Sequence, residues 1–417
     1  MPSTETLSEI FNSIRQNKVR TVLAGFGVAW GIFILVVLLG AGEGFRKGVM
    51  LMFSSFAQKS MYVYGGTTSQ AYKNISEGVP ITFDDRYLAE LQLRYSDEIR
   101  AISPQISTYA TVRNVERVET FNISGVSSDF FRVRLLEAKR GGRIFNLLDT
   151  KHKRNVAVIG ENVANTLFGK KQALNKNVEI AGEYFQIVGI IKNDNIFSIS
   201  DVNSVYIHYD NYLRCFGYNL TFNSFCLLLN NNVNTTDFEQ ELKNYIAHKS
   251  NFDKEDSQAL YVSNIEAQTS SFESLFNSIN VVIWIVGLCF LLSGIVGICN
   301  VMLIIVKERT NEIGIRQAVG AEPHSIVSLI MAESVVITLS AGLVGILFGY
   351  GALQIIDLLI GALVSEQSIM SQTELNIPMV IFALWVLVLS GIAAGLFPAI
   401  KASRIMPVDA IRFENRG

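Results

Sequence analysis

Four long uncharged segments constrain what this chain can fold into more than any other feature of its sequence. Asp, Glu, Lys and Arg are absent from residues 21–42, 274–306, 334–356 and 375–400, and each segment is at least 22 residues long. About 20 apolar residues in a helix span the hydrocarbon core of a bilayer. Only 17% of the whole chain is charged, against about 25% in soluble domains. We therefore predict four transmembrane helices, at residues 21–42, 280–306, 325–356 and 375–400.

The positive charges outside the large central segment indicate how these spans are oriented. Lys and Arg occur before the first span, between the second and third spans, and after the fourth span, whereas residues 357–374 contain neither. Short cytoplasmic loops are enriched in Lys and Arg, and long domains cross the membrane regardless of charge. We therefore predict that residues 1–20, 307–324 and 401–417 are cytoplasmic, and that residues 43–279 and 357–374 lie outside the cytoplasm.

The segment between the first and second spans, about 237 residues (43–279), is large enough for one or two compact cores. Residues 107–114 and 117–125 alternate like a hairpin, and residues 161–168 have a helical pattern that Gly169 ends. Alternating strands and helices indicate an α+β domain in two lobes. The predicted fold is an integral membrane α-helical protein with four transmembrane helices and a large extracytoplasmic α+β domain between the first two.

Motifs for catalysis and metal binding are missing from the sequence. It contains no GxxxxGK[ST] loop, no HExxH pair and no GxSxG elbow, and its four His and four Cys form no ligand cluster. We expect no catalysis, no metal and no cofactor bound by this chain. The formal net charge of −2 gives no indication of a nucleic-acid partner. Cys215 and Cys226 lie in the external domain and could form a disulfide, or both could be free buried thiols.

One acidic residue lies within the predicted third span. Glu333 is about two turns from the cytoplasmic end, and an intramembrane acid is a candidate functional residue. It could instead snorkel to the interface, or pair with Lys307 or with the helix in the 307–324 loop. Two GxxxG pairs allow close helix packing, either within the chain or between two copies: Gly345 with Gly349, and Gly391 with Gly395.

The 307–324 loop can hold one short helix between two spans. Residues 308–319 contain a single Gly and no Pro, and Glu312 with Arg316 forms a stabilising i, i+4 pair. Gly320 suits the end of a helix. Such a helix would lie at the membrane surface, where a partner could move it.

Two apolar residues on this charged helix, Ile313 and Ile315, need a surface against which to bury. That surface could be lipid or a groove on a partner protein. A second interfacial helix is predicted over residues 4–18, because apolar residues recur there at helical spacing with charges opposite. This N-terminal amphipathic helix would lie flat on membrane lipid, or would serve only as a juxtamembrane anchor.

The segment Lys307 to Ala321 (KERTNEIGIRQAVGA) resembles the coupling segment of MacB/FtsX-type ABC transporter permeases, whose pattern is ERxxEIGIRxAxGA. Residues 399–412 (AIKASRIMPVDAIR) and 18–21 (KVRT) resemble other motifs of this family, and residues 141–189 contain its glycine-punctuated strands. The resemblance covers nearly the whole chain. It implies that the following residues couple the chain to an ATPase: Glu308, Arg309, Glu312, Ile313, Gly314, Ile315, Arg316, Gly320 and Ala321.

By this resemblance, the chain would be the permease subunit of a MacB-type ABC transporter in the bacterial cytoplasmic (inner) membrane. Two copies of an ABC ATPase subunit would bind ATP and Mg, and a second permease copy or a paralogue would complete a dimer. MacB carries its ATPase on the same polypeptide, whereas this chain starts almost directly at the membrane, so we expect a separate ATPase subunit. Whether a periplasmic adaptor and an outer-membrane channel attach stays open.

The resemblance also implies how such a permease works. ATP hydrolysis would move the external domain by mechanotransmission, for efflux or extraction of amphipathic compounds, peptides or lipoproteins. That domain would divide into a membrane-proximal lobe (about 43–111 and 214–279) and an inserted distal lobe (about 112–213). The alternative is a membrane-anchored sensor or scaffold, or an FtsX-like division regulator without transport, although the external domain of such regulators is normally much smaller.

Labelling of the 307–324 loop tests the orientation on which this interpretation depends. A reagent that cannot cross the membrane should modify a cysteine placed in this loop only when it is added from the cytoplasmic side. Modification in intact cells from the outer side would contradict the coupling role, because a cytoplasmic ATPase could not reach the helix.

Overall fold

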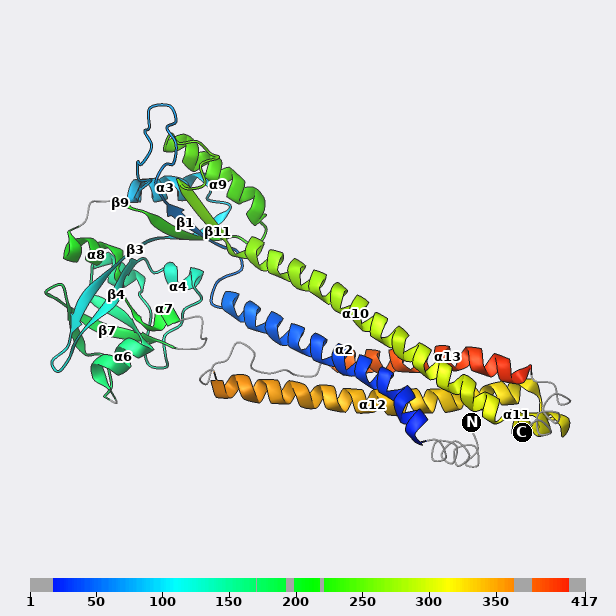
Figure 1. Cartoon of the computed structure of the whole chain (residues 1–417). Coiled ribbons are helices and arrows are strands. Elements are labelled where there is room, and N and C mark those ends of the chain that lie inside the picture. Colours follow the sequence, from blue (N-terminus) through cyan, green and yellow to red (C-terminus); the bar gives the residue numbers. More distant parts are fainter. Residues whose placement is uncertain (1–17, 170, 193–198, 218–220, 364–376, 405–417) are drawn as a thin grey trace. The chain divides into compact units, whose positions relative to one another are not determined.

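The chain divides into two compact units, which are described separately. One unit contains residues 1–47 and 275–417, and the other contains residues 48–274. The computed structural model (Figure 1) describes residues 18–169, 171–192, 199–217, 221–363 and 377–404. Most of the predicted N-terminal amphipathic helix (4–18) and most of the C-terminal tail (401–417) lie outside the described residues.

Four helices in the described part of the chain are long and apolar enough to cross a membrane, as predicted. The helices α2 and α10 contain 36 and 44 residues, which corresponds to roughly 54 and 66 Å at about 1.5 Å per residue. Both are longer than the hydrocarbon core of about 30 Å, so each continues beyond the membrane. The four helices are α2 (Lys18–Phe53), α10 (Ile265–Glu308), α12 (Pro323–Leu363) and α13 (Ile377–Ser403).

All four helices are longer than the uncharged segments that predicted them, and α12 and α13 both continue past the charged residue at which the predicted span ended. The predicted external loop begins at Asp357, but α12 continues through Asp357 to Leu363. Similarly, α13 continues through Lys401 to Ser403. A charged residue marks where a helix leaves hydrocarbon, but it does not break the helix, because Asp and Lys differ from Ala in helix propensity by only about 0.7 kcal/mol or less.

The first GxxxG pair brings α12 against α2. A Cβ placed at Gly345 would lie 2.4 Å from the carbonyl oxygen of Ala29, and one at Gly349 would lie 2.9 Å from the Cβ of Val36. Neither position has room for a larger side chain while the two helix backbones keep this separation. The absence of a side chain at these two residues therefore sets how closely α2 and α12 pack.

The second GxxxG pair brings α13 against α12. A Cβ at Gly391 would lie 3.0 Å from the Cα of Val335, and one at Gly395 would lie 2.8 Å from the Cβ of Ser334. The Ser334 hydroxyl donates a hydrogen bond of 2.7 Å to the carbonyl oxygen of Gly391. Both glycine pairs therefore contact helices of the same chain.

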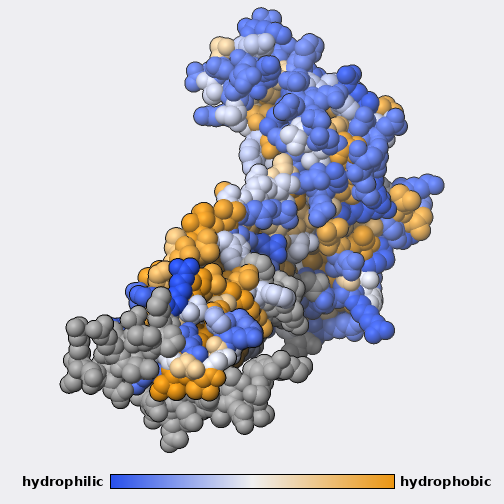
Figure 2. Space-filling model, turned by 90° about the vertical axis from the view of Figure 1, so that its right-hand side faces the viewer, coloured by the Kyte–Doolittle hydropathy of each residue, from blue (hydrophilic) through white to orange (hydrophobic). Residues whose placement is uncertain are grey.

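The surface of this helical unit is strongly apolar. Hydrophobic residues gather over it in Figure 2, whereas the surface of the other unit is mainly hydrophilic. Leu347, Phe348 and Leu358 on α12 each have more than 65% of their surface exposed. Contiguous exposed apolar surface of this kind is typical of helices that face lipid.

The second unit contains a nine-stranded sheet in the order β11-β1-β10-β3-β4-β8-β5-β7-β6, in which β6 also pairs with β3. The six strands from β3 to β6 therefore close into a ring, and β10, β1 and β11 extend the sheet from β3. The strands are β1 (Ser60–Gly65), β3 (Ile99–Arg113), β4 (Val118–Val126), β5 (Val156–Gly160), β6 (Asn177–Ile180), β7 (Glu183–Ile191), β8 (Ser204–His208), β10 (Ser224–Leu229) and β11 (Leu260–Asn264).

Strand β3 belongs to both lobes of this unit. Its residues 99–105 pair with β10, and its residues 105–113 pair with β4. The predicted start of the inserted lobe, at residue 112, falls inside this strand. The ring encloses a core of its own, which includes Val112, Ile159, Phe185 and Ile207.

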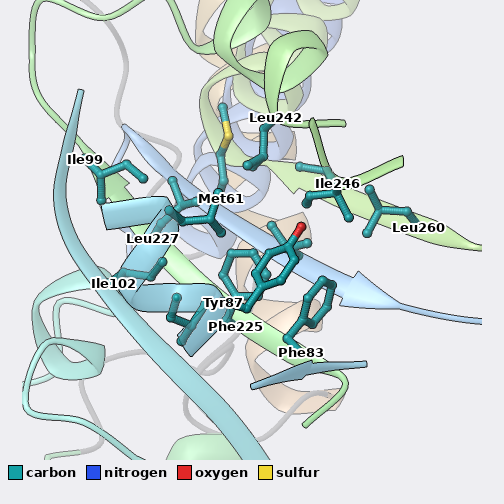
Figure 3. Close-up of a cluster of buried hydrophobic side chains, with 14 of the residues drawn as sticks. Met61, Phe83, Tyr87, Ile99, Ile102, Phe225, Leu227, Leu242, Ile246 and Leu260 are labelled. Atoms are coloured by element: carbon teal, nitrogen blue, oxygen red, sulfur yellow. The ribbon is translucent and has the colours of Figure 1, made fainter. Parts of the chain in front are cut away.

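The other lobe packs two helices on the extension of the sheet (Figure 3). Met61 of β1 and Phe225 and Leu227 of β10 meet Leu242 and Ile246 of α9 in one buried cluster. Tyr87 of α3 and Leu260 of β11 belong to the same cluster. This lobe contains α3 (Asp85–Arg94), α9 (Thr235–Lys249) and a short β2–β9 pair (Phe83–Asp84 with Thr221–Phe222).

The remaining helices of the unit are short and connect strands. Asn146 caps α5 in a capping box with Asp149, and Gly169 ends α6 with a positive φ of 60°. These helices are α4 (Phe130–Val133), α5 (Leu147–Lys151), α6 (Glu161–Phe168), α7 (Ile199–Val202) and α8 (Tyr209–Phe216).

Cys215 and Cys226 do not form the disulfide that the sequence allowed. Both are free thiols, and they pack in different apolar clusters: Cys215 on the core of the ring, and Cys226 in a cluster with Tyr62 and Phe130. The structure therefore agrees with the alternative in which both thiols are free. Burial raises the pKa of both thiols, which disfavours the reactive thiolate.

Two substitutions on α12 test the packing of the membrane helices. Gly345→Ala should lower the free energy of unfolding by about 1–3 kcal/mol, because the added Cβ meets backbone that cannot rotate away. Gly351→Ala on the same helix has nothing within 4 Å of the added atom and should leave stability unchanged or slightly raised. Thermal unfolding in detergent measures both, and equal midpoints would contradict the close approach to α2.

Candidate functional site

The candidate site is α11 (Thr310–Ala318), a short helix that the chain forms by interrupting a longer one. The helix α10 ends at Glu308, and Arg309 leaves the helical conformation with φ −94° and ψ 14°. The Thr310 hydroxyl donates a 2.8 Å hydrogen bond to the carbonyl oxygen of Lys307. This bond satisfies a carbonyl at the end of α10, where the intrahelical partner is lost.

The C-terminal end of α11 is a Schellman motif. The amide of Ala321 donates a hydrogen bond of 2.9 Å to the carbonyl oxygen of Arg316. The amide of Gly320 donates one of 3.1 Å to the carbonyl oxygen of Gln317. Gly320 has a φ of 101°, a conformation that residues with a Cβ adopt only at a cost. Gly320 therefore ends the helix as predicted, and α12 begins three residues later at Pro323.

Arg309 connects α11 to the acidic residue inside the third span. Its Nε lies 2.8 Å from Oε2 of Glu312, and its Nη1 lies 3.4 Å from Oε2 of Glu333. The Glu333 side chain is 3% exposed. Of the alternatives left open by the sequence, pairing with this helix is the one that the structure contains, although the partner is Arg309 rather than Lys307.

The same cluster keeps Glu312 ionised. The hydrogen bond from Arg309 holds the pKa of Glu312 below its usual range, with additional attraction from Arg316. The predicted i, i+4 pair of Glu312 with Arg316 is present at 3.9 Å. Both carboxylates of the cluster, Glu312 and Glu333, thus lie next to the Arg309 guanidinium.

Ile313 fixes the opposite side of α11 to the spans. Its side chain packs in the apolar cluster of the membrane unit, together with Ile305, Val306, Ile326 and Ile330. The pocket left around it has a volume of only about 20 Å³, which is close to the minimum for one water molecule. Ile313 and Gly314 are therefore buried against this chain itself, not against a partner.

Ile315 behaves differently from Ile313. Its side chain is 53% exposed, and Val319, one turn later, is 85% exposed. Residues four apart lie on one face of a helix, so Ile315 and Val319 form an exposed apolar pair, which we call the outward pair. The sequence prediction grouped Ile315 with Ile313 and did not include Val319.

A third contact joins α11 to the last span. Nε2 of Gln317 donates a hydrogen bond of 3.4 Å to the carbonyl oxygen of Ser403, near the end of α13. Through Arg309, Ile313 and Gln317, α11 is attached to α10, α12 and α13. The helix that carries the outward pair therefore contacts three of the four membrane helices.

Two protein-family models match this chain. The model of the MacB-like periplasmic core domain matches residues 21–245, which is more than half of the chain, and that of the FtsX-like permease C-terminal domain matches residues 284–407. The chain belongs to the MacB/FtsX family of ABC transporter permeases. It is thus a multi-pass membrane protein whose large domain, between the first and second spans, is of the MacB periplasmic type.

Individual relatives agree with this assignment. The macrolide export ATP-binding/permease protein MacB of Neisseria gonorrhoeae is 27% identical over 402 residues, covering 96% of this chain and 59% of the relative. The uncharacterized ABC transporter permease YknZ of Bacillus subtilis is 26% identical over 413 residues, covering 98% of this chain and 99% of the relative. The chain therefore spans less than two thirds of the MacB relative and nearly all of YknZ.

Two solved structures resemble part of the MacB/FtsX permease described here. The periplasmic region of MacB from Actinobacillus actinomycetemcomitans matches 52% of this chain and 94% of that chain, with 16% identity and a TM-score of 0.42. The extracellular domain of YknZ matches 49% of this chain and 100% of that chain, with 17% identity and a TM-score of 0.40.

The ion pair between Arg309 and Glu333 can be tested by a double-mutant cycle. Arg309→Ala should lower the free energy of unfolding by about 2 kcal/mol, because the buried Glu333 carboxylate loses a charged hydrogen-bond donor. Glu333→Gln should cost less than Arg309→Ala, and in the Arg309→Ala background it should recover part of the loss. The measurement is thermal unfolding in detergent at neutral pH. Strictly additive effects would show that the two side chains do not interact.

Proposed function

We propose that this permease converts ATP hydrolysis by a partner ATPase into motion of its external domain, with α11 as the coupling helix. The observation that carries the proposal is the division of α11 into two sides. One side is attached to the spans through Arg309 and Ile313, and the other side presents the outward pair, Ile315 and Val319. A helix that transmits force needs one side fixed to the part that moves and one side available to the part that pushes.

The ATPase would hold the exposed side of α11 in a groove. Ile315 and Val319 supply the apolar contact, and Glu308, which is also exposed, lies near the end of α10. Closure of two ATPase subunits on ATP and Mg would shift α11 as a rigid body. Because α11 is attached to α10, α12 and α13, we propose that the spans move with it.

The motion would leave the membrane through α2 and α10. Both helices run without a break from the membrane-spanning segment into the unit of residues 48–274. Phe45 of α2 contacts Phe276 of α10 with ring centroids 5.7 Å apart, and Phe53 contacts Phe272 at 5.6 Å. These ring contacts hold the two helices together beyond the spans, so we propose that they act as one stalk.

The remaining features of the transporter follow from the family and from the predicted orientation. We propose that α11 and both termini face the cytoplasm of a bacterium, that the ATPase is a separate subunit, and that a second permease copy or a paralogue completes the assembly. MacB relatives are named for macrolide export, and we propose a substrate class of amphipathic compounds, peptides or lipoproteins for this chain.

Substitution of the outward pair tests the coupling proposal. The double variant Ile315→Asp/Val319→Asp should fold normally, because both side chains are exposed, but should bind the ATPase about tenfold more weakly or worse. The measurement is co-purification with the ATPase encoded beside this chain, together with the ATPase rate of the complex. Val115→Ser, at a residue of the external unit that is fully exposed, is the matched control and should change neither quantity.

Arg309→Ala separates coupling from binding in the same assay. This substitution leaves the outward pair intact, so the ATPase should still bind, while its rate should respond less to the permease. Wild-type binding and wild-type stimulation by the Ile315→Asp/Val319→Asp variant would rule out α11 as the helix that contacts the ATPase.

A further inference from the structure

A cavity of about 470 Å³ lies within the unit of residues 48–274. It is lined by the last turn of α2 and the first turn of α10, and by strands from both lobes, so its walls come from segments between Met52 and Gln268. Sites for small molecules typically have volumes of about 300–1,000 Å³. The coupling role proposed for α11 does not involve this cavity, because no residue of α11 lines it.

Three buried polar atoms in the cavity wall make no hydrogen bond of good geometry with another described residue: the hydroxyl of Tyr62, Oε1 of Gln105 and Nε of Arg134. The side chains of Tyr62 and Arg134 lie close enough to interact with each other. Tyr62 as a whole is only 4% exposed. Nearly all buried polar groups in proteins have a hydrogen-bond partner. Three such atoms at one cavity can accept or donate hydrogen bonds to water or to a polar ligand that enters it.

The formal charges in the cavity wall compensate each other. Arg134 forms a buried ion pair with Asp201, and the hydroxyl of Tyr206 donates a 2.7 Å hydrogen bond to the other oxygen of Asp201. Burial raises the pKa of Tyr62 and of Tyr206, so both hydroxyls stay neutral. A charged ligand would have no counter-charge in this site, and an unpaired buried charge is costly. The site therefore favours an uncharged ligand.

The other lining residues are of two kinds. Six of them are aromatic: Phe53, Phe56, Tyr62, Tyr64, Phe130 and Tyr206. Most of the rest carry amides or hydroxyls, such as those of Gln105, Asn122, Ser124 and Gln268, and such groups both donate and accept hydrogen bonds. The matching ligand has apolar faces for the rings and several groups that both donate and accept.

We propose that this cavity binds a neutral saccharide unit, either as a free sugar or as the headgroup of a glycolipid. A pyranose ring presents C–H faces to aromatic rings, and its hydroxyls both donate and accept, as hydrogen bonding to Tyr62, Gln105 and Arg134 requires. The bound sugar would also contact Phe53, the last residue of α2, and Phe56, which follows that helix. The proposal depends on the geometry of the external unit alone and not on the coupling role of α11.

Saturation-transfer NMR on the full chain in phosphatidylcholine nanodiscs tests this proposal. The neutral probe is N,N′-diacetylchitobiose, and the anionic comparison is glucose 6-phosphate. We expect transfer to the neutral disaccharide and little or none to the phosphate. Tyr62→Phe and Gln105→Ala should each weaken binding about two- to tenfold, the effect of losing one neutral hydrogen bond. Absence of transfer to the disaccharide at about 10 mM would overturn the proposal.

Tyr87→Phe is the matched control. Its hydroxyl is also buried without a hydrogen bond of good geometry, but it lies on α3, in the core between the sheet and the two helices α3 and α9, and outside the cavity. This variant should bind the disaccharide as the wild type does. Equal binding by Tyr62→Phe, Gln105→Ala and the wild type would overturn the assignment of the site.

Nanodiscs that contain a neutral monoglucosyl lipid distinguish the two sources of the sugar. A weaker disaccharide signal in these discs would identify the lipid headgroup as a ligand, and an unchanged signal would identify the free sugar. The readout requires no ATPase, so its result is independent of the test of coupling.

Discussion

The bilayer imposes the constraint on which the rest of this structure depends. Hydrocarbon offers no hydrogen bonds to a backbone, so each crossing has to be a helix that satisfies its own amides and carbonyls. Irregular backbone is then restricted to the ends of spans, and α11 lies at such an end. The break at Arg309 and the turn at Gly320 place polar backbone where water, or the side chain of Thr310, can satisfy it. The candidate coupling site is therefore located where the membrane first permits a change of direction.

The sequence contained enough information for the spans and for the C-terminal end of α11, but not for the break at Arg309, where α10 ends and α11 begins. Charge-free runs predict membrane helices because burial of a charge in lipid is costly. Gly320 predicts a helix end because glycine readily adopts the positive φ that such an end requires, and Gly320 has this conformation in the structure. The division between Ile313 and Ile315 could also have been derived. Residues two apart lie about 200° apart around a helix, so the two side chains cannot share one surface. The i, i+4 spacing of Ile315 and Val319 was the signal that the prediction missed.

The external unit was less predictable for a physical reason. Hairpins such as β3–β4 are local, but the ring requires β8 to insert between β4 and β5, and β6 to return to β3. Such pairings depend on packing between distant segments, which local alternation does not encode. The cavity is an extreme case, since Tyr62, Gln105 and Arg134 come from three separate segments. Only the completed sheet brings them to one place.

The junction between β11 and α10 has a mechanical consequence. Strand β11 ends at Asn264 and α10 begins at Ile265, so no linker separates them. A flexible tether would absorb rotation of the helix, but a direct joint of strand and helix cannot. The first turn of α10 therefore keeps a fixed direction relative to β11, which is an edge strand of the nine-stranded sheet.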